Sequence, residues 1–82
     1  MILTEFLERG KKMRTDEYWQ TEAHNKTMLE AIRDFCRTNW PDDRRARRPD
    51  ENGVFKLIGG NNTYQCYFVD NIPGVWRIKR IS

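Results

Sequence analysis

Residues 54–81, VFKLIGGNNTYQCYFVDNIPGVWRIKRI, contain three stretches in which apolar and polar side chains alternate. Alternation with a period of two is typical of a β-strand that buries one face. Two turn-rich segments, GGNN at 59–62 and NIPG at 71–74, separate the stretches and are too short for parallel crossovers. The sequence therefore predicts a three-stranded antiparallel β-meander over residues 54–82.

The alternation also predicts which side chains share a face of this sheet. The apolar face, expected to pack on the rest of the chain, comprises Phe55, Leu57, Tyr64, Cys66, Phe68, Trp76 and Ile78. The opposite face is expected to carry Lys56, Gln65, Tyr67, Arg77 and Lys79. Bases around an aromatic ring on an open sheet are typical of a nucleic-acid surface, because cations hold the backbone while the ring stacks on a base. The alternative is an ordinary solvated face, on which basic side chains oppose aggregation.

The first half of the chain has helical periodicity. Ile2, Leu3, Phe6 and Leu7 predict a short first helix that stops near Gly10. A second helix is predicted to start at a Thr15 cap and to end by Trp40, before Pro41. Its apolar stripe consists of Trp19, Ala23, Met28, Ile32, Phe35 and Cys36. The segment AHNK at 23–26 interrupts the stripe, so the helix is expected to kink there or to divide in two.

These elements predict an α+β fold in which N-terminal helices pack on one face of the three-stranded meander. We expect one domain over residues 1–82, with a helical part at 1–40, an Arg-rich connector at 41–53 and the meander at 54–82. A chain of 82 residues is close to the lower limit for an independent core, so its stability margin should be thin. A homodimer, or docking on a partner, would supplement it.

The segment WPDDRRARRPD at 40–50, which includes most of the connector, carries a cluster of arginines: Arg44, Arg45, Arg47 and Arg48. One interpretation is a solvated loop in which neighbouring carboxylates offset the charge; the other is a flexible phosphate clamp, since guanidinium groups match phosphate oxygens. Residues 1–43 hold seven Lys/Arg against nine Asp/Glu, whereas residues 44–82 hold eight against three. The basic second half favours nucleic acid or a nucleoprotein as the partner.

The sequence contains no recognisable catalytic or metal-binding motif, and we expect neither a cofactor nor a metal. His24, the sole histidine, has no acidic or nucleophilic partner in a motif and is expected to face solvent or to cap a helix. Cys36 and Cys66 have no metal or redox spacing and are expected to be free buried thiols in a cytoplasmic protein. No apolar run approaches the length of a membrane span.

The segments VFKLIGGNNTYQCYFVD and GVWRIKRI, after helices, resemble the second half of the small mRNA-cleaving toxins of the RelE/HigB superfamily. In that family a strand, a Gly/Asn-rich turn, a Tyr-containing strand and a basic last strand follow two helices. The resemblance covers about the last 30 residues and implies that Arg77, Lys79 and Arg80 would stabilise the phosphate of a cleaved RNA. The chain departs from the family in lacking a clear first strand, in having Gln65 after the tyrosine, and in ending without a C-terminal His or Tyr.

Three functions follow as hypotheses. The leading one is binding of nucleic acid, RNA or DNA, without catalysis. The alternatives are an inhibitor of the kind that phages and plasmids encode, which docks on a host or defence enzyme, and a RelE/HigB-like ribonuclease. The residues expected to make the contacts are Arg44, Arg45, Arg47, Arg48, Lys56, Tyr67, Arg77, Lys79 and Arg80.

Overall fold

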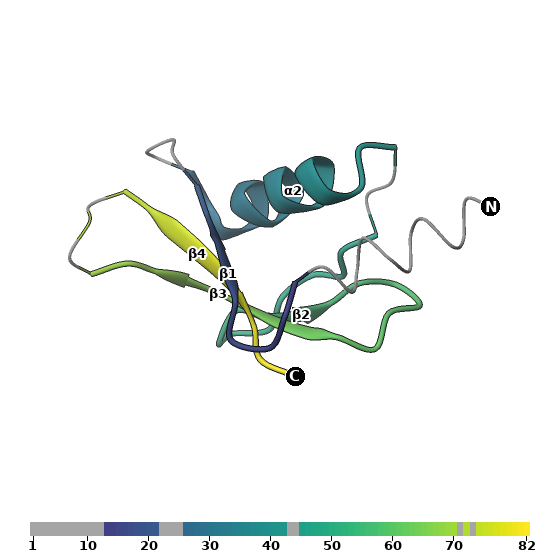
Figure 1. Cartoon of the computed structure of the whole chain (residues 1–82). Coiled ribbons are helices and arrows are strands. Elements are labelled where there is room, and N and C mark those ends of the chain that lie inside the picture. Colours follow the sequence, from purple (N-terminus) through teal and green to yellow (C-terminus); the bar gives the residue numbers. More distant parts are fainter. Residues whose placement is uncertain (1–12, 22–25, 43–44, 71, 73) are drawn as a thin grey trace.

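The protein is an α+β structure, and in the described part of the chain one helix packs on a four-stranded antiparallel sheet (Figure 1). The computed structural model describes residues 13–21, 26–42, 45–70, 72 and 74–82. The spatial order of the strands is β1-β4-β3-β2. The predicted α+β class is confirmed, but the sheet has four strands rather than three, and the described residues contain one helix where several were predicted. The elements are β1 (Tyr18–Gln20), α2 (Met28–Asn39), β2 (Val54–Lys56), β3 (Thr63–Phe68) and β4 (Trp76–Arg80).

The meander predicted from residues 54–82 is confirmed as strands β2, β3 and β4. Phe55 lies opposite Tyr64, and Cys66 lies opposite Ile78, so their side chains share the face that α2 covers. At the β3–β4 connection Gly74 has a φ of 75°, which suits the third position of a type II turn. The alternation of apolar side chains therefore predicted the meander and the side chains that share its buried face.

The fourth strand, β1, replaces the start of the predicted second helix. Thr15 does not cap a helix: it lies in a tight turn in which the Glu17 N–H donates to the Arg14 carbonyl over 3.0 Å. Asp16 has a φ of 71°, a left-handed conformation that short polar side chains tolerate, and its N–H donates to the Arg80 carbonyl over 2.8 Å. The turn directs Tyr18–Gln20 along the free edge of β4, where their backbone groups complete its hydrogen bonds. The first predicted helix, residues 2–10, lies outside the described residues.

Capping residues at both ends of helix α2 determine where it begins and ends. Thr27 is the N-cap, and its Oγ1 accepts a hydrogen bond from the Glu30 N–H over 3.2 Å. Trp40 is the C-cap, and its N–H donates to the Cys36 carbonyl over 2.7 Å. The end before Pro41 is as predicted. The buried part of the predicted stripe is therefore contributed by this single helix, from its residues Ile32, Phe35 and Cys36.

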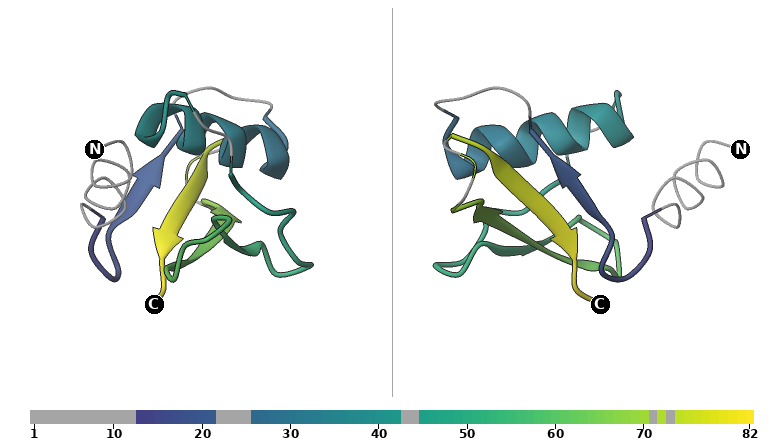
Figure 2. Two further views of the ribbon diagram at one scale, coloured as in Figure 1. Left: turned by 90° about the vertical axis from the view of Figure 1, so that its right-hand side faces the viewer. Right: turned by 60° about the vertical axis from the view of Figure 1, so that its left-hand side comes forward.

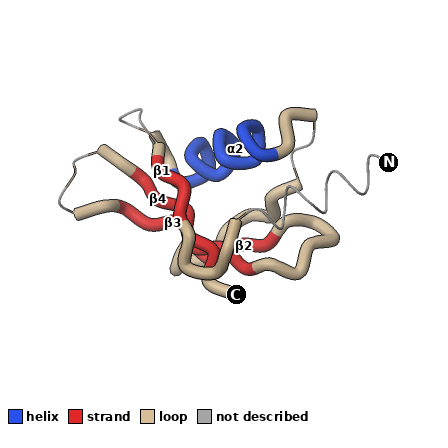
Figure 3. The backbone as a smooth tube through the Cα atoms, in the orientation of Figure 1, coloured by secondary structure: helices blue, strands red, loops and turns tan. Residues whose placement is uncertain are grey.

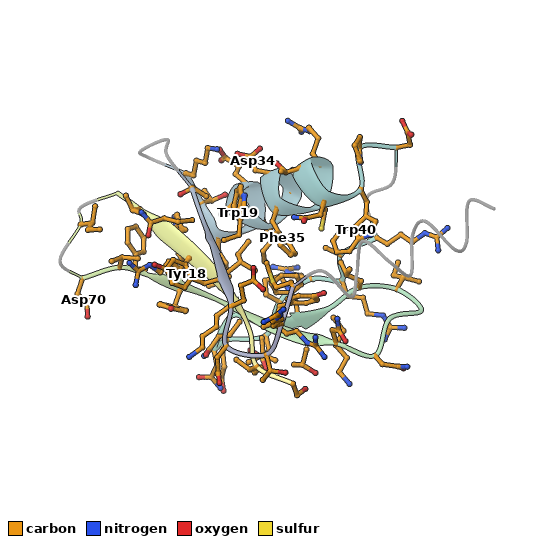
Figure 4. All side chains as sticks on the ribbon, in the orientation of Figure 1. Tyr18, Trp19, Asp34, Phe35, Trp40 and Asp70 are labelled. Atoms are coloured by element: carbon orange, nitrogen blue, oxygen red, sulfur yellow. The ribbon has the colours of Figure 1, made fainter. Side chains whose placement is uncertain are left out.

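The core is organised around the Phe35 ring, which projects from the middle of α2 toward the sheet (Figure 4). The centroid of this ring lies 5.4 Å from that of Tyr64, 5.7 Å from Trp40, 5.8 Å from Trp19 and 6.4 Å from Phe55. Most of these contacts are tilted or edge-to-face, the arrangements that aromatic quadrupoles favour. One helical side chain thus joins three strands and the end of α2.

Trp76 fixes the other end of the helix–sheet contact. Its indole Nε1 donates to the Lys26 carbonyl over 2.6 Å, and its backbone exchanges hydrogen bonds with Thr21. Trp76 is 9% exposed, as predicted, but Phe68 is 49% exposed, so the prediction that Phe68 is buried is wrong. Phe68 is the last residue of β3, and its ring lies tilted at 45° against Trp76, with 4.1 Å between the centroids. Alternation predicted the direction of this side chain but not how far the helix covers the strand.

The Arg-rich connector is not a free loop, because residues 45–50 pair with β2 as the second arm of a hairpin. We call residues 45–50 the hairpin arm. The Ile58 N–H donates to the Arg45 carbonyl over 2.6 Å, and the Arg47 N–H donates to the Lys56 carbonyl over 3.1 Å. Figure 3 draws this arm as loop running beside β2. The described part of the segment is therefore paired with the sheet, and phosphate binding by its arginines stays a prediction.

Asp50 and Gly53 close this hairpin. The Asp50 Oδ1 accepts hydrogen bonds from the Asn52 and Val54 N–H groups over 2.8 and 2.9 Å. Gly53 has a φ of 78°, and a Cβ at this position would collide with the Cys66 carbonyl oxygen. The turn chemistry of the connector therefore holds the arm against β2 and β3.

The contrast between Trp76 and Phe68 gives a test of the packing. Trp76→Ala should lower the free energy of unfolding by roughly 3–5 kcal/mol, because it opens a cavity and removes the bond to Lys26. Phe68→Ala should cost clearly less, since about half of that side chain remains in water in the folded state. Urea unfolding followed by circular dichroism measures both. Equal losses from the two variants would contradict the assignment of Trp76 to the core and Phe68 to its edge.

Candidate nucleic-acid interface

The face of the sheet that points away from α2 carries the residues that the sequence singled out. The register places Arg77 of β4 opposite Tyr67, and Lys79 opposite Gln65, so these side chains share that face. The predicted grouping is confirmed. Figure 2 shows α2 on one side of the sheet and no described element across the other. We call this surface the open face; its members are Tyr18, Gln20, Val54, Lys56, Thr63, Gln65, Tyr67, Arg77 and Lys79.

Two members of the open face were missed by the sequence analysis, because they belong to β1. Tyr18 pairs with Lys79 and Gln20 pairs with Arg77, and Tyr18 is 49% exposed. The helical interpretation of this segment gave no face to either residue. Only Trp19 of β1 is directed inward, and a strand of three residues leaves no clear alternation in the sequence.

Arg77 lies at the centre of the open face, between strands that each contribute a tyrosine. Its guanidinium carbon is 4.4 Å from the centroid of the Tyr18 ring, which is cation–π geometry. Its Nε donates to the Gln20 Oε1 over 2.8 Å. These contacts hold the guanidinium across β1, while Tyr67 flanks Arg77 on β3. The arrangement places one cation over the Tyr18 ring, on a strand whose other neighbour, β3, contributes Tyr67 to the same face.

Lys79 and Gln65 continue the polar surface toward the other end of the strands. The Lys79 Nζ lies 3.5 Å from the Asp16 Oδ1, and 79% of the Asp16 side chain is exposed. An ion pair this exposed contributes little, so an incoming phosphate can replace the carboxylate without a large loss. Gln65 donates through Nε2 to the Asn52 carbonyl over 3.1 Å. The face is thus polar, and two successive outward-facing positions of β4 carry the cations Arg77 and Lys79.

Arg80 does not join this surface. By alternation it lies on the same side as Ile78, and its Nη1 donates to the Met13 carbonyl over 2.8 Å. Its Nε donates to the Ser82 carbonyl over 3.1 Å. Arg80 therefore ties the segments before β1 and after β4 together, and the three basic residues of β4 do not converge on one point.

The arginines of the connector also lie apart from Arg77 and Lys79. Arg44 and His24 lie outside the described residues. Arg45 is exposed on the hairpin arm, whereas Arg47 and Arg48 line a groove between the arm and α2. Strands β2 and β3 lie between the arm and β4, so the backbones of the arm and β4 are roughly 14 Å apart. Lys56 is the nearest cation of the open face to the arm, since its carbonyl accepts the Arg47 N–H.

The described residues offer no group prepared for covalent chemistry. Burial raises the pKa of the Cys66 thiol to about 12 and also raises the pKa of Tyr64 above its ordinary value. Both groups stay protonated at neutral pH and belong to the core. Cys36 and Cys66 are buried thiols outside any disulfide, as predicted. Within the described ranges no cluster of three His, Cys, Asp or Glu side chains could hold a metal ion.

Comparison of the chain with models of protein families, with curated protein sequences and with solved structures finds no match. In the described part of the chain, no helix combines the length and apolar character that a membrane crossing requires.

The two thiols give a test of the core that borders the open face. In the folded protein Cys36 and Cys66 should react slowly with a thiol reagent, and both should react rapidly after denaturation without reductant. Absorbance of the released chromophore measures the two rates. Two thiols that stay unreactive after denaturation would contradict the free, buried state.

The raised pKa of Cys66 predicts a pH dependence as well. The folded state disfavours the thiolate, so ionisation of Cys66 favours unfolding. Its contribution to the free energy of unfolding is therefore fully present below the ordinary pKa of 9.0 and is lost as pH rises toward about 12. Cys66→Ala should therefore lose less stability than the unaltered protein between these pH values, as measured by urea unfolding. Parallel losses in the two proteins would contradict this assignment.

Proposed function

We propose that the protein binds single-stranded nucleic acid on the open face, without catalysis. The observation that carries the proposal is the position of Arg77 on a sheet face that no described element covers: its guanidinium lies over the Tyr18 ring at 4.4 Å, and Tyr67 is its cross-strand neighbour on β3. In this arrangement Arg77 and Lys79 contact the phosphates, and the two rings stack on bases. Gln20 and Gln65 offer amide groups for hydrogen bonds to base edges or sugars.

The spacing of the rings supports a strand with unpaired bases. Tyr18 and Tyr67 lie on β1 and β3, which are separated by β4, and their positions along the strands differ by two residues. Their Cα atoms are therefore roughly 12 Å apart across the face. That span leaves room for the Arg77 guanidinium and a phosphate between two stacked bases. A duplex hides the faces of its bases, so a flat surface with rings favours RNA loops or single-stranded RNA or DNA.

A RelE/HigB-like ribonuclease is an alternative with less support. Strand β1 supplies the strand before the helix that the sequence did not reveal. However, Arg80 is engaged by the Met13 and Ser82 carbonyls on the other side of the sheet, so the cations proposed to stabilise a transition state are divided. Phosphate binding by Arg77 and Lys79 alone is sufficient for the non-catalytic function.

The binding proposal is tested with fluorescein-labelled oligouridine and oligothymidine in fluorescence anisotropy. Tyr67→Ala and Tyr18→Ala should each weaken binding by roughly 1–3 kcal/mol through the loss of one stacking partner. Tyr67→Phe should restore most of the affinity, because the ring and not the hydroxyl makes the contact. Arg77→Gln should weaken binding and reduce the magnitude of the salt slope by about 0.7.

Arg37→Gln is the matched control for Arg77→Gln. It removes the same charge from the exposed side of α2, where Arg37 pairs only loosely with Asp34 at 3.6 Å. This variant should bind as the unaltered protein does. Equal effects of Arg37→Gln and Arg77→Gln, or no binding at low salt by the unaltered protein, would overturn the proposal.

A further inference from the structure

A second surface lies on the other side of the molecule, where the hairpin arm passes α2. The two elements enclose a groove of about 380 Å³. Its apolar lining comes from Leu29 and Ile32 of the helix and from Ala46 of the arm. Ile32 is buried, but Leu29 is 39% exposed, so the apolar lining is accessible from solvent. The remaining lining residues are Arg33, Arg47 and Arg48.

Both walls of the groove are held in place by the fold. Leu29, Ile32 and Arg33 lie on one face of α2 because of their helical spacing, and the other side of that helix is fixed by the core. On the arm, Ala46 pairs with Leu57 and packs against the core cluster. The backbone bonds of the arm to β2 then fix the position of the arginines that follow. The groove is therefore a built feature of the surface.

The arginines of the groove lack carboxylate partners among the described residues. No ion pair is found there for Arg33, Arg47 or Arg48, whereas Arg37, one turn further along α2, lies 3.6 Å from Asp34. Like charges that gather without counter-charges are unfavourable, more so beside apolar side chains that reduce hydration. The groove is thus complementary to a ligand that combines carboxylates with an apolar group.

We infer that this groove docks an acidic segment of a partner protein. The segment places one large apolar side chain against Leu29 and Ala46 and directs flanking carboxylates to Arg33 and Arg48. Arginine forks bind carboxylates through paired hydrogen bonds, and arginine is enriched where binding energy concentrates at protein interfaces. A free small molecule would remain largely exposed here, whereas small-molecule pockets enclose most of their ligand. A nucleic acid strand has no aliphatic side chain for the apolar lining.

The test uses a short fluorescein-labelled peptide in which one leucine and one phenylalanine are flanked by glutamates. The unaltered full-length protein should bind it, and binding should be lost when serine replaces the two apolar residues or glutamine replaces the glutamates. Arg33→Gln and Arg48→Gln should each weaken binding by about tenfold, the value of one hydrogen bond to a charged group. Leu29→Gln should also weaken it, whereas Arg37→Gln, which removes the same charge outside the groove, should leave it unchanged.

Several results would overturn the inference. Equal losses with Arg33→Gln and Arg37→Gln would show diffuse attraction, and equal binding of the serine peptide would show that the apolar lining is not used. Displacement of the peptide by oligouridine, lost in Arg48→Gln, would assign the groove to nucleic acid. Self-association in sedimentation velocity that Arg33→Gln abolishes would assign it to a second copy. Absence of peptide binding at low salt would also contradict the inference.

Discussion

The packing of the Phe35 ring against the sheet is the interaction on which the rest of the structure depends. In so short a chain, one aromatic side chain from the helix meets rings from β1, β2 and β3 and from the end of α2. These segments are distant in the sequence, so their common contact determines the side of the sheet on which the helix lies. Among the described elements only α2 packs on the sheet, so none of them covers the other side. The open face is therefore a consequence of the core.

The same constraint explains why the molecule presents two chemically different surfaces. On the open face, the alternation of each strand places polar and basic side chains opposite the buried rings, and β1 adds Tyr18 and Gln20 beside Arg77. On the helix side, the hairpin arm closes against β2 and leaves an apolar groove with arginines around it. The first surface suits bases and phosphates, and the second suits an acidic polypeptide. Because β2 and β3 separate the arm from β4, each surface can be altered independently.

The alternating half of the chain could be predicted from the sequence, since a period of two fixes both pairing and facing; Lys56, Gln65, Tyr67, Arg77 and Lys79 were grouped correctly. The β1 strand could not be recognised, because Trp19 fits the helical spacing of Met28 and Ile32 as well as it fits a strand, and three residues are too few to show alternation. The arm was missed because its pairing comes from backbone bonds, which leave little trace in side-chain pattern. The burial of Phe68 was misjudged because it depends on where α2 begins above the sheet, which the alternation of the strands does not reveal.

The central claim, that the open face and not the groove receives nucleic acid, is tested most directly by titrating ¹⁵N-labelled protein with oligouridine in two-dimensional NMR. The account predicts that the largest shift changes fall on Gln20, Tyr67, Arg77 and Lys79, with the amides of Leu29, Arg33, Ala46 and Arg48 unaffected. Changes concentrated along α2 and the hairpin arm, with the outward-facing residues of β3 and β4 unmoved, would contradict it.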